Sequence, residues 1–144
     1  MGKEPMGNVL ATVAIENLAD LYAARRGEIP AEGTRRIEVD DARIVTGATM
    51  LGIPKRLIGT LGLVPGRTHP TRTAAGSVTV RIYGTVRLSI QGRECTCDVK
   101  EVPDDGPVLI GKVPLGLLDF VVDPAGRRLI GNPEHGGEHI LEMY

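Results

Sequence analysis

The sequence predicts an all-β domain with short helices, and three observations support this prediction. Aromatic residues make up only 3% of the 144 residues, with no Trp and one Phe, so Val, Ile and Leu must build the core and favour strands. Nineteen Gly and ten Pro interrupt the chain often, as tight turns between short strands require. Apolar and polar residues alternate along several segments, as in half-buried strands. We expect a single domain over residues 1–144 with a core of its own.

Two strands and two helices are expected in the first half of the chain. Residues 9–15 and 35–45 alternate in strand fashion. Asn17 can cap a first helix that ends near Gly27, and Pro54 can open a second helix that ends at Gly62. The expected apolar stripes are Leu18, Leu21 and Tyr22 on the first helix, and Leu57, Ile58 and Leu61 on the second, which covers residues 55–61.

Hairpins are expected to dominate the second half. Residues 66–70 are predicted to be a loop, and the cationic stretch 67–72 is interpreted as solvated loop. A hairpin with a tip of small residues follows at 72–78 and leads into a strand at 78–83. The remaining elements are a hairpin with strands 86–90 and 95–99, a turn at 103–107, a strand at 108–111, a helical turn at 114–118, and a closing hairpin with strands 120–122 and 128–130 around a turn at 124–126.

Charge and composition argue against several classes of function. The formal net charge of −1 creates no global field that would attract nucleic acid or an anionic membrane. No stretch approaches the ~18 apolar residues of a membrane span, and the first residues do not resemble a leader, so we expect a cytoplasmic protein. Cys95 and Cys97 share one face of a predicted strand, which is poor geometry for a disulfide between them. They are interpreted as reduced, half-buried thiols, with a disulfide to a partner subunit as the alternative.

Three segments stand in an order that points to a family. The first is Val45-Thr46-Gly47-Ala48-Thr49 at a strand end, the second is the hairpin tip Thr73-Ala74-Ala75-Gly76-Ser77, and the third is Leu109-Ile110-Gly111 before Pro114-Leu115. With this order the chain resembles the bacterial branch of the retropepsin-like (retroviral-type) aspartic proteases. Residues 118–124 and 132–135 also look like that branch, so the resemblance covers nearly the whole chain. It implies a closed acid-protease barrel of six to eight strands with short helices, one lobe per subunit of a homodimer, and a peptide or protein substrate in the groove between subunits.

The resemblance also assigns a site, which departs from the family at one position. Val45 stands where the family has its catalytic aspartate, followed by Thr46 and Gly47. In the family the two aspartates of the dimer share a proton and act as base and acid, and valine can do neither. The resemblance implies substrate contacts from Ala48, Thr49, Thr73, Ala74, Ala75, Gly76 and Ser77.

The sequence therefore predicts an aspartic endopeptidase family member that is inactive as written. Symmetry removes both carboxylates at once, and Asp40 and Asp41 are interpreted as hydrated acids that do not replace them. The Thr46 hydroxyl is expected to keep a structural role across the dimer axis. A non-catalytic peptide-binding dimer is the alternative function, and a heterodimer with an active paralogue is a variant of it.

Two other motifs match known chemistry poorly. Residues 135–139 have the His-x-x-Glu-His spacing of inverted zinc peptidases, but two glycines disfavour the required helix, so an exposed tail is expected. Residues 106–112 have phosphate-loop spacing, but Val113 stands where a Ser or Thr would bind magnesium. No histidine is placed to activate Thr49, Thr73 or Ser77 as a nucleophile. We expect no cofactor and no metal.

Overall fold

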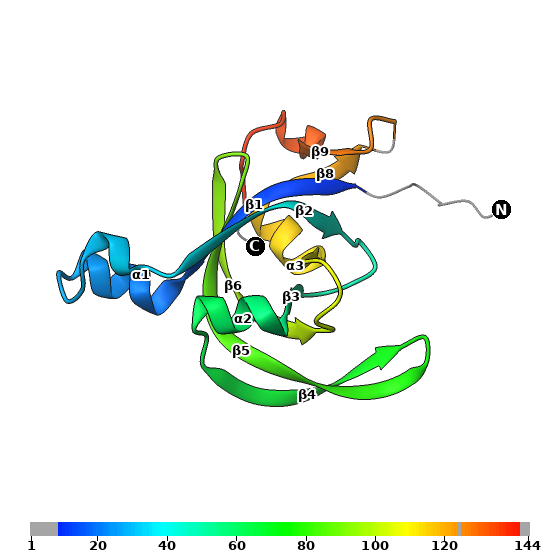
Figure 1. The fold of residues 1–144 in the computed structure, drawn as a ribbon. Helices are drawn as coiled ribbons and strands as arrows, with labels where there is room; N and C mark the ends of the chain where they lie inside the picture. The colour runs from blue at the N-terminus through cyan, green and yellow to red at the C-terminus, as the bar shows by residue number, and fades with distance from the viewer. Residues whose placement is uncertain (1–8, 124, 142–144) are drawn as a thin grey trace.

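Six strands of the computed structural model, which describes residues 9–123 and 125–141, form a closed barrel (Figure 1). Their order is β1-β2-β7-β3-β6-β5, and the ring closes because β1 also pairs with β5. Closure pairs both edges of each strand, which removes the exposed edges of an open sheet. The prediction of a mostly β fold with short helices is confirmed. The strands are β1 Leu10–Asn17, β2 Arg36–Ile44, β3 Leu51–Pro54, β5 Gly76–Ile90, β6 Arg93–Val102 and β7 Leu109–Ile110.

The strand β3 is an element that the sequence analysis missed. All four of its residues are buried, and it runs parallel to β6 and antiparallel to β7. A strand covered on both faces shows no alternation of apolar and polar residues, so periodicity gives no signal for it.

The strand β4, Pro65–Thr73, lies outside the ring and pairs only with β5. The prediction of a loop at residues 66–70, and of a solvated loop at 67–72, is therefore wrong, although the segment is exposed as expected. Both faces of β4 meet solvent, so its sequence carries no apolar face, and an edge strand tolerates Pro65 and Pro70. The β4–β5 hairpin extends from the barrel and turns at Ala74 and Ala75 (Figure 1).

The strand β5 continues through the point where the sequence analysis separates two strands. It runs for 15 residues, and its pairing with β6 shifts register between Tyr83 and Val86. A bulge of this kind bends a strand without ending it, so one element serves both the outer hairpin and the barrel. The turn between β5 and β6 is as predicted, with Gln91 and Gly92 at φ of 50° and 82°.

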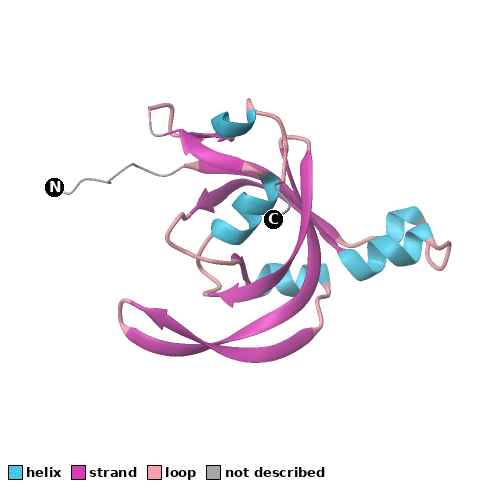
Figure 2. Ribbon diagram, turned by 180° about the vertical axis from the view of Figure 1, so that it is seen from behind, coloured by secondary structure: helices cyan, strands magenta, loops and turns pink. Residues whose placement is uncertain are grey.

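The helices begin where the sequence places their caps. The Asn17 side chain accepts a hydrogen bond from the Asp20 N–H (3.0 Å) at the start of α1, Leu18–Arg25. The helix α2, Lys55–Leu61, follows Pro54 and ends at Gly62 in the left-handed conformation (φ 64°). The apolar stripe of α2 is buried at Ile58 and Leu61, but α1 buries no residue and projects from the barrel (Figures 1 and 2).

The chain after β7 packs against the core of the barrel. The helix α3, Lys112–Leu118, buries Pro114, Leu115 and Leu118, and β8, Phe120–Asp123, pairs with β9, Arg128–Gly131. The predicted turn at 124–126 includes Pro124, which lies outside the described residues. Two 3-10 turns, η1 Ala31–Gly33 and η2 Pro133–His135, complete the fold.

Aliphatic side chains fill the barrel, as the composition predicts. The fully buried ones include Ile15, Leu51, Ile53, Leu88 and Ile110, and each contributes about 1.5–3 kcal/mol on burial. Within the described part of the chain, no helix is both long and apolar enough to cross a membrane.

Candidate functional site

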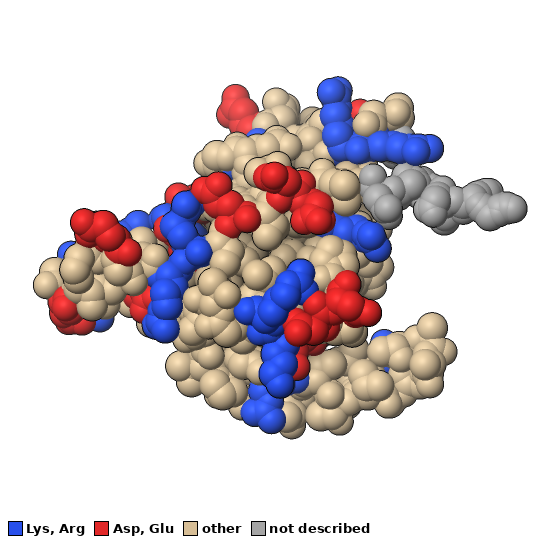
Figure 3. All heavy atoms as spheres, viewed as in Figure 1, with Lys and Arg blue, Asp and Glu red and all other residues tan. Residues whose placement is uncertain are grey.

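A cleft of about 670 Å³ lies between the β4–β5 hairpin and the loop that follows β2. In Figure 3 the surface between the hairpin and the barrel is hollowed. Val45, Gly47, Ala48 and Thr49 line the cleft from the barrel side, and Thr73 lines it from the hairpin. The structure thus brings together two segments that the sequence analysis assigned to one site.

Backbone hydrogen bonds hold the loop after β2 in place. The Val45 N–H donates to the Ile110 carbonyl (2.9 Å), and the Lys112 and Val113 N–H groups donate to the Ala48 and Thr49 carbonyls (2.9 Å each). The third predicted segment, residues 109–111, therefore supports the loop directly. The contact needs glycine, because a Cβ on Gly111 would lie 2.7 Å from the Met50 carbonyl oxygen.

Val45 occupies the cleft as a half-buried apolar side chain. None of the described residues that line the cleft is Asp or Glu. Asp40 and Asp41 are exposed on β2, at a register shift in its pairing with β1, and do not line the cleft. The described lining of the cleft therefore supplies no pair of carboxylates for acid–base chemistry.

Several predicted contact residues lie beside the cleft rather than in it. Thr46 is exposed and does not line it, and neither do the tip residues Ala74, Ala75, Gly76 and Ser77. The hydroxyl of Thr73 donates to the Gly76 carbonyl (2.7 Å) and accepts from the Ala75 N–H (3.2 Å), which closes the tip. Residues 73–80 carry no charge, and the end of the hairpin is free of charged side chains in Figure 3.

The structure adds a group of basic lining residues that the sequence analysis did not assign to the site. They are Arg67, His69 and Arg72 on β4, and Lys100 on β6. The cationic run 67–72 was the available signal, but its interpretation as a loop separated it from the cleft. Lys100 gave no signal, since only the pairing of β6 with β3 and β5 places it there.

Neither the models of known protein families nor the sequences of curated proteins match this chain.

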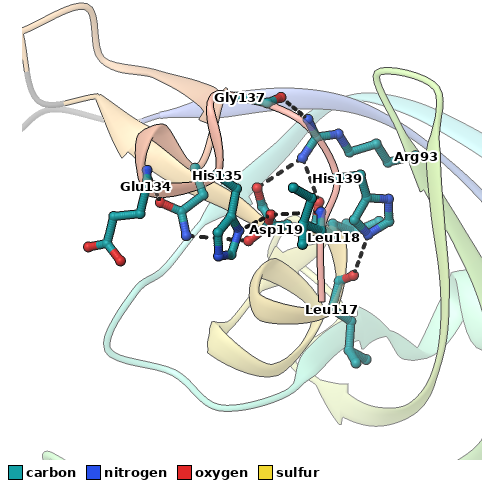
Figure 4. A network of polar contacts seen from close by, with 10 residues as sticks. Arg93, Leu117, Leu118, Asp119, Glu134, His135, Gly137 and His139 are labelled. Atoms are coloured by element: carbon teal, nitrogen blue, oxygen red, sulfur yellow. Dashed lines mark hydrogen bonds and ion pairs between the residues drawn. The ribbon is translucent and has the colours of Figure 1, made fainter. Parts of the chain in front are cut away.

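A second polar cluster joins the C-terminal segment to α3 (Figure 4). The Nδ1 of His135 lies 2.6 Å from a carboxylate oxygen of Asp119, whose side chain also accepts from the Ile140 N–H (3.1 Å) and the Asn132 amide (3.4 Å). These hydrogen bonds, that from His135 above all, hold the pKa of Asp119 below its usual range, although burial acts in the opposite direction. Arg93 donates to the carbonyls of Leu118 and Asp119 (2.9 Å each).

The expectation of an exposed tail at residues 135–139 is therefore wrong for His135, whose side chain is only 14% exposed. The Nε2 of His139 lies 2.9 Å from the Leu117 carbonyl oxygen. The two histidines therefore contact different residues (Figure 4). Among the described residues, no group of three or more His, Cys, Asp and Glu side chains is placed to hold a metal ion. The cluster attaches residues 132–140 to the end of α3.

The two cysteines and the phosphate-loop pattern take no part in the cleft. Cys95 and Cys97 are free thiols, each half-buried on β6, as predicted. A hydrogen bond with Cys95, together with burial, raises the pKa of Cys97, which disfavours its thiolate. Residues 106–112 run from a bend at Gly106 through the buried Val108 and β7 to the first residue of α3, so they do not form a phosphate-binding loop of exposed backbone amides.

Proposed function

We propose that this chain is a retropepsin-like aspartic endopeptidase by descent and that it binds peptides in its cleft without cleaving them. The observation that carries the proposal is the composition of the cleft. The Val45–Thr49 loop and the β4–β5 hairpin line one cavity. The position assigned to the catalytic aspartate holds valine there, and none of the lining residues within 9–123 and 125–141 carries a carboxylate. The hairpin would serve as a flap over an extended peptide.

The loss of activity follows from the chemistry that valine lacks. Peptide hydrolysis by paired aspartates needs one carboxylate as base toward water and one protonated carboxyl as acid toward the carbonyl oxygen. Positioned acid–base groups contribute about 10²- to 10⁴-fold each, and groups that act as a unit fail together. Val45 supplies neither group, and the acids nearest in sequence, Asp40 and Asp41, are exposed on β2.

A homodimer is part of the proposal, and exposed apolar side chains beside the loop support it. Val113 and Leu117 are 47% and 37% exposed on α3, and Ile140 and Leu141 are 43% and 51% exposed. The Val113 N–H donates to the Thr49 carbonyl, and the His139 ring contacts the Leu117 carbonyl, so this surface adjoins the cleft loop. A partner covering it would bring two Val45 side chains near one axis, where an apolar pair avoids the cost of buried charge.

A paired cleavage assay tests the proposal. The chain and its Val45→Asp variant are incubated with a diverse peptide mixture at acid and neutral pH, with and without an active-site inhibitor of aspartic proteases. We expect cleavage by the variant alone, blocked by the inhibitor. Cleavage by the unchanged chain would refute the assignment of Val45, and the absence of cleavage by a folded, dimeric Val45→Asp variant would refute the descent.

A second candidate is a heterodimer with an active paralogue, which would supply one of the two carboxylates. The half-buried position of Val45 in an open cleft is compatible with either partner. Isolation of the chain from its native source would distinguish them, since a heterodimer carries a second subunit with an intact Asp-Thr-Gly segment.

A further inference from the structure

The cleft is basic although the chain as a whole is not. Three cationic side chains, Arg67, Arg72 and Lys100, line it together with His69, and none of its described lining residues is acidic. The formal net charge of the chain is −1, so this excess of positive charge is local to the cleft. Such a concentration of one sign in a cleft raises the local concentration of ligands of the opposite sign.

These cations also have no acidic partner among the described residues. Over residues 9–123 and 125–141, Arg67, Arg72 and Lys100 form no ion pair. Some arginines elsewhere are paired, as Arg35 is with Asp20 (2.7 Å) and Arg87 with Glu16 (2.5 Å). The donors of the cleft cations are therefore available to an incoming anion.

The placement of the basic groups suits an elongated ligand. Arg67 lies at a register shift in the pairing of β4 with β5, and His69 follows it on the same exposed edge strand. The Nδ1 of His69 donates to the Pro70 carbonyl (2.8 Å), so Nε2 of the neutral ring is an acceptor and the donors for a carboxylate come from the two arginines and Lys100. Lys100 approaches from β6, where it pairs with Ile82, so cations line the cleft from two elements.

The other lining residues favour a peptide over a nucleic acid. Val45, Met50 and Ile82 supply an apolar surface suited to aliphatic side chains, and the part of the chain that the structure describes places no aromatic residue in the cleft to stack on bases. The unpaired edge of β4 offers backbone N–H and C=O groups to an added strand, the usual mode for extended peptides.

We propose that the cleft selects acidic extended peptides, in which Glu or Asp side chains meet Arg67, Arg72 and Lys100 while the residues between them contact the apolar surface. This inference rests on the proposed function, because it names the class of peptide that the same cleft would bind. It is independent of whether Val45→Asp restores cleavage.

Fluorescence anisotropy with the full chain tests this selectivity. The probes are a labelled peptide of alternating Glu and Val, the same peptide with Gln for Glu, the same peptide with Lys for Glu, and a single-stranded oligothymidylate of equal charge. We expect the Glu peptide to bind at least about tenfold more tightly than the Gln peptide at low salt, with the advantage reduced at high salt. The Lys peptide and the oligonucleotide should bind more weakly than the Glu peptide.

Charge reversals locate the binding. Arg67→Glu and Lys100→Glu should each weaken binding of the Glu peptide by about tenfold or more and leave that of the Gln peptide within about twofold. Arg81→Glu is the matched control, because this substitution makes the same change in net charge. Arg81 is exposed on the same hairpin and does not line the cleft. Circular dichroism establishes that each variant is folded.

The outcomes separate the two proposals. If no peptide of any charge binds, peptide binding itself is refuted. If the Gln or Lys peptide binds as tightly as the Glu peptide, the cleft binds peptides but the acidic preference is wrong. A tighter complex with the oligonucleotide, or an equal loss in Arg81→Glu, would also overturn the inference.

Discussion

Asp119 shows how one residue can fix the end of the chain. It is 7% exposed, adopts a left-handed conformation (φ 59°) after α3, and holds His135, Asn132 and the Ile140 N–H through its side chain. Asp tolerates this conformation better than most residues, which lets one position end a helix and anchor a distant segment. The apolar residues Ile140 and Leu141 are thereby kept close to α3.

The lowered pKa of Asp119 predicts a dependence of stability on pH. A carboxyl whose pKa is lower in the folded state contributes stability above its unfolded pKa, and this contribution is lost as pH falls through the folded value. We expect the free energy of unfolding in urea to fall more steeply below about pH 4 in the unchanged chain than in Asp119→Asn. Asn keeps an acceptor and tolerates the backbone conformation, so it isolates the charge. Parallel pH curves for the two proteins would contradict this role.

At the scale of elements, β7 and the start of α3 hold the cleft loop in position through backbone hydrogen bonds. This support depends on the close approach of Gly111 to residues 48–50, where an added Cβ would lie 2.7–2.8 Å from backbone atoms. Backbone atoms cannot move aside as a flexible side chain can, so substitution must displace the loop.

We expect Gly111→Ala to lower the free energy of unfolding by about 1–3 kcal/mol, measured by urea denaturation. Gly116→Ala is the control, since Gly116 lies in the adjoining helix α3 and a Cβ there meets nothing within 4 Å. Helix propensity favours Ala at that position by up to about 1 kcal/mol. Equal destabilisation by the two substitutions would contradict the role given to Gly111.

At the scale of the whole molecule, the proposed dimer places the exposed apolar surface of α3 against a second copy. We expect Leu117→Asp to shift the chain from dimer to monomer in sedimentation equilibrium, with a dissociation constant raised by more than about tenfold. Val64→Asp is the matched control, because Val64 is 72% exposed and lies beside α1 rather than α3. A monomeric unchanged chain, or a dimer unaffected by Leu117→Asp, would refute this interface.

Local chemistry was sufficient to predict several features of the fold. The cap at Asn17, the stop at Gly62 and the turn at residues 91–92 depend on contacts within a few residues, so sequence spacing alone predicts them. The aliphatic composition likewise predicts strands around an aliphatic core. The position of β4 was not predictable in this way, because an exposed edge strand is defined by its pairing with β5 and not by a pattern of its own.

The sequence by itself determined that the side chain preceding Thr46-Gly47 cannot titrate. Valine has no ionisable group, and no surroundings can give it one. Only the tertiary structure decided which groups surround it. The register of β6 brings Lys100 to the cleft, the pairing of β4 brings Arg67 and His69, and the path of the chain end brings His135 to Asp119. These contacts join residues far apart in the chain, so strand pairing and packing over long sequence distances, rather than any local preference, bring them together.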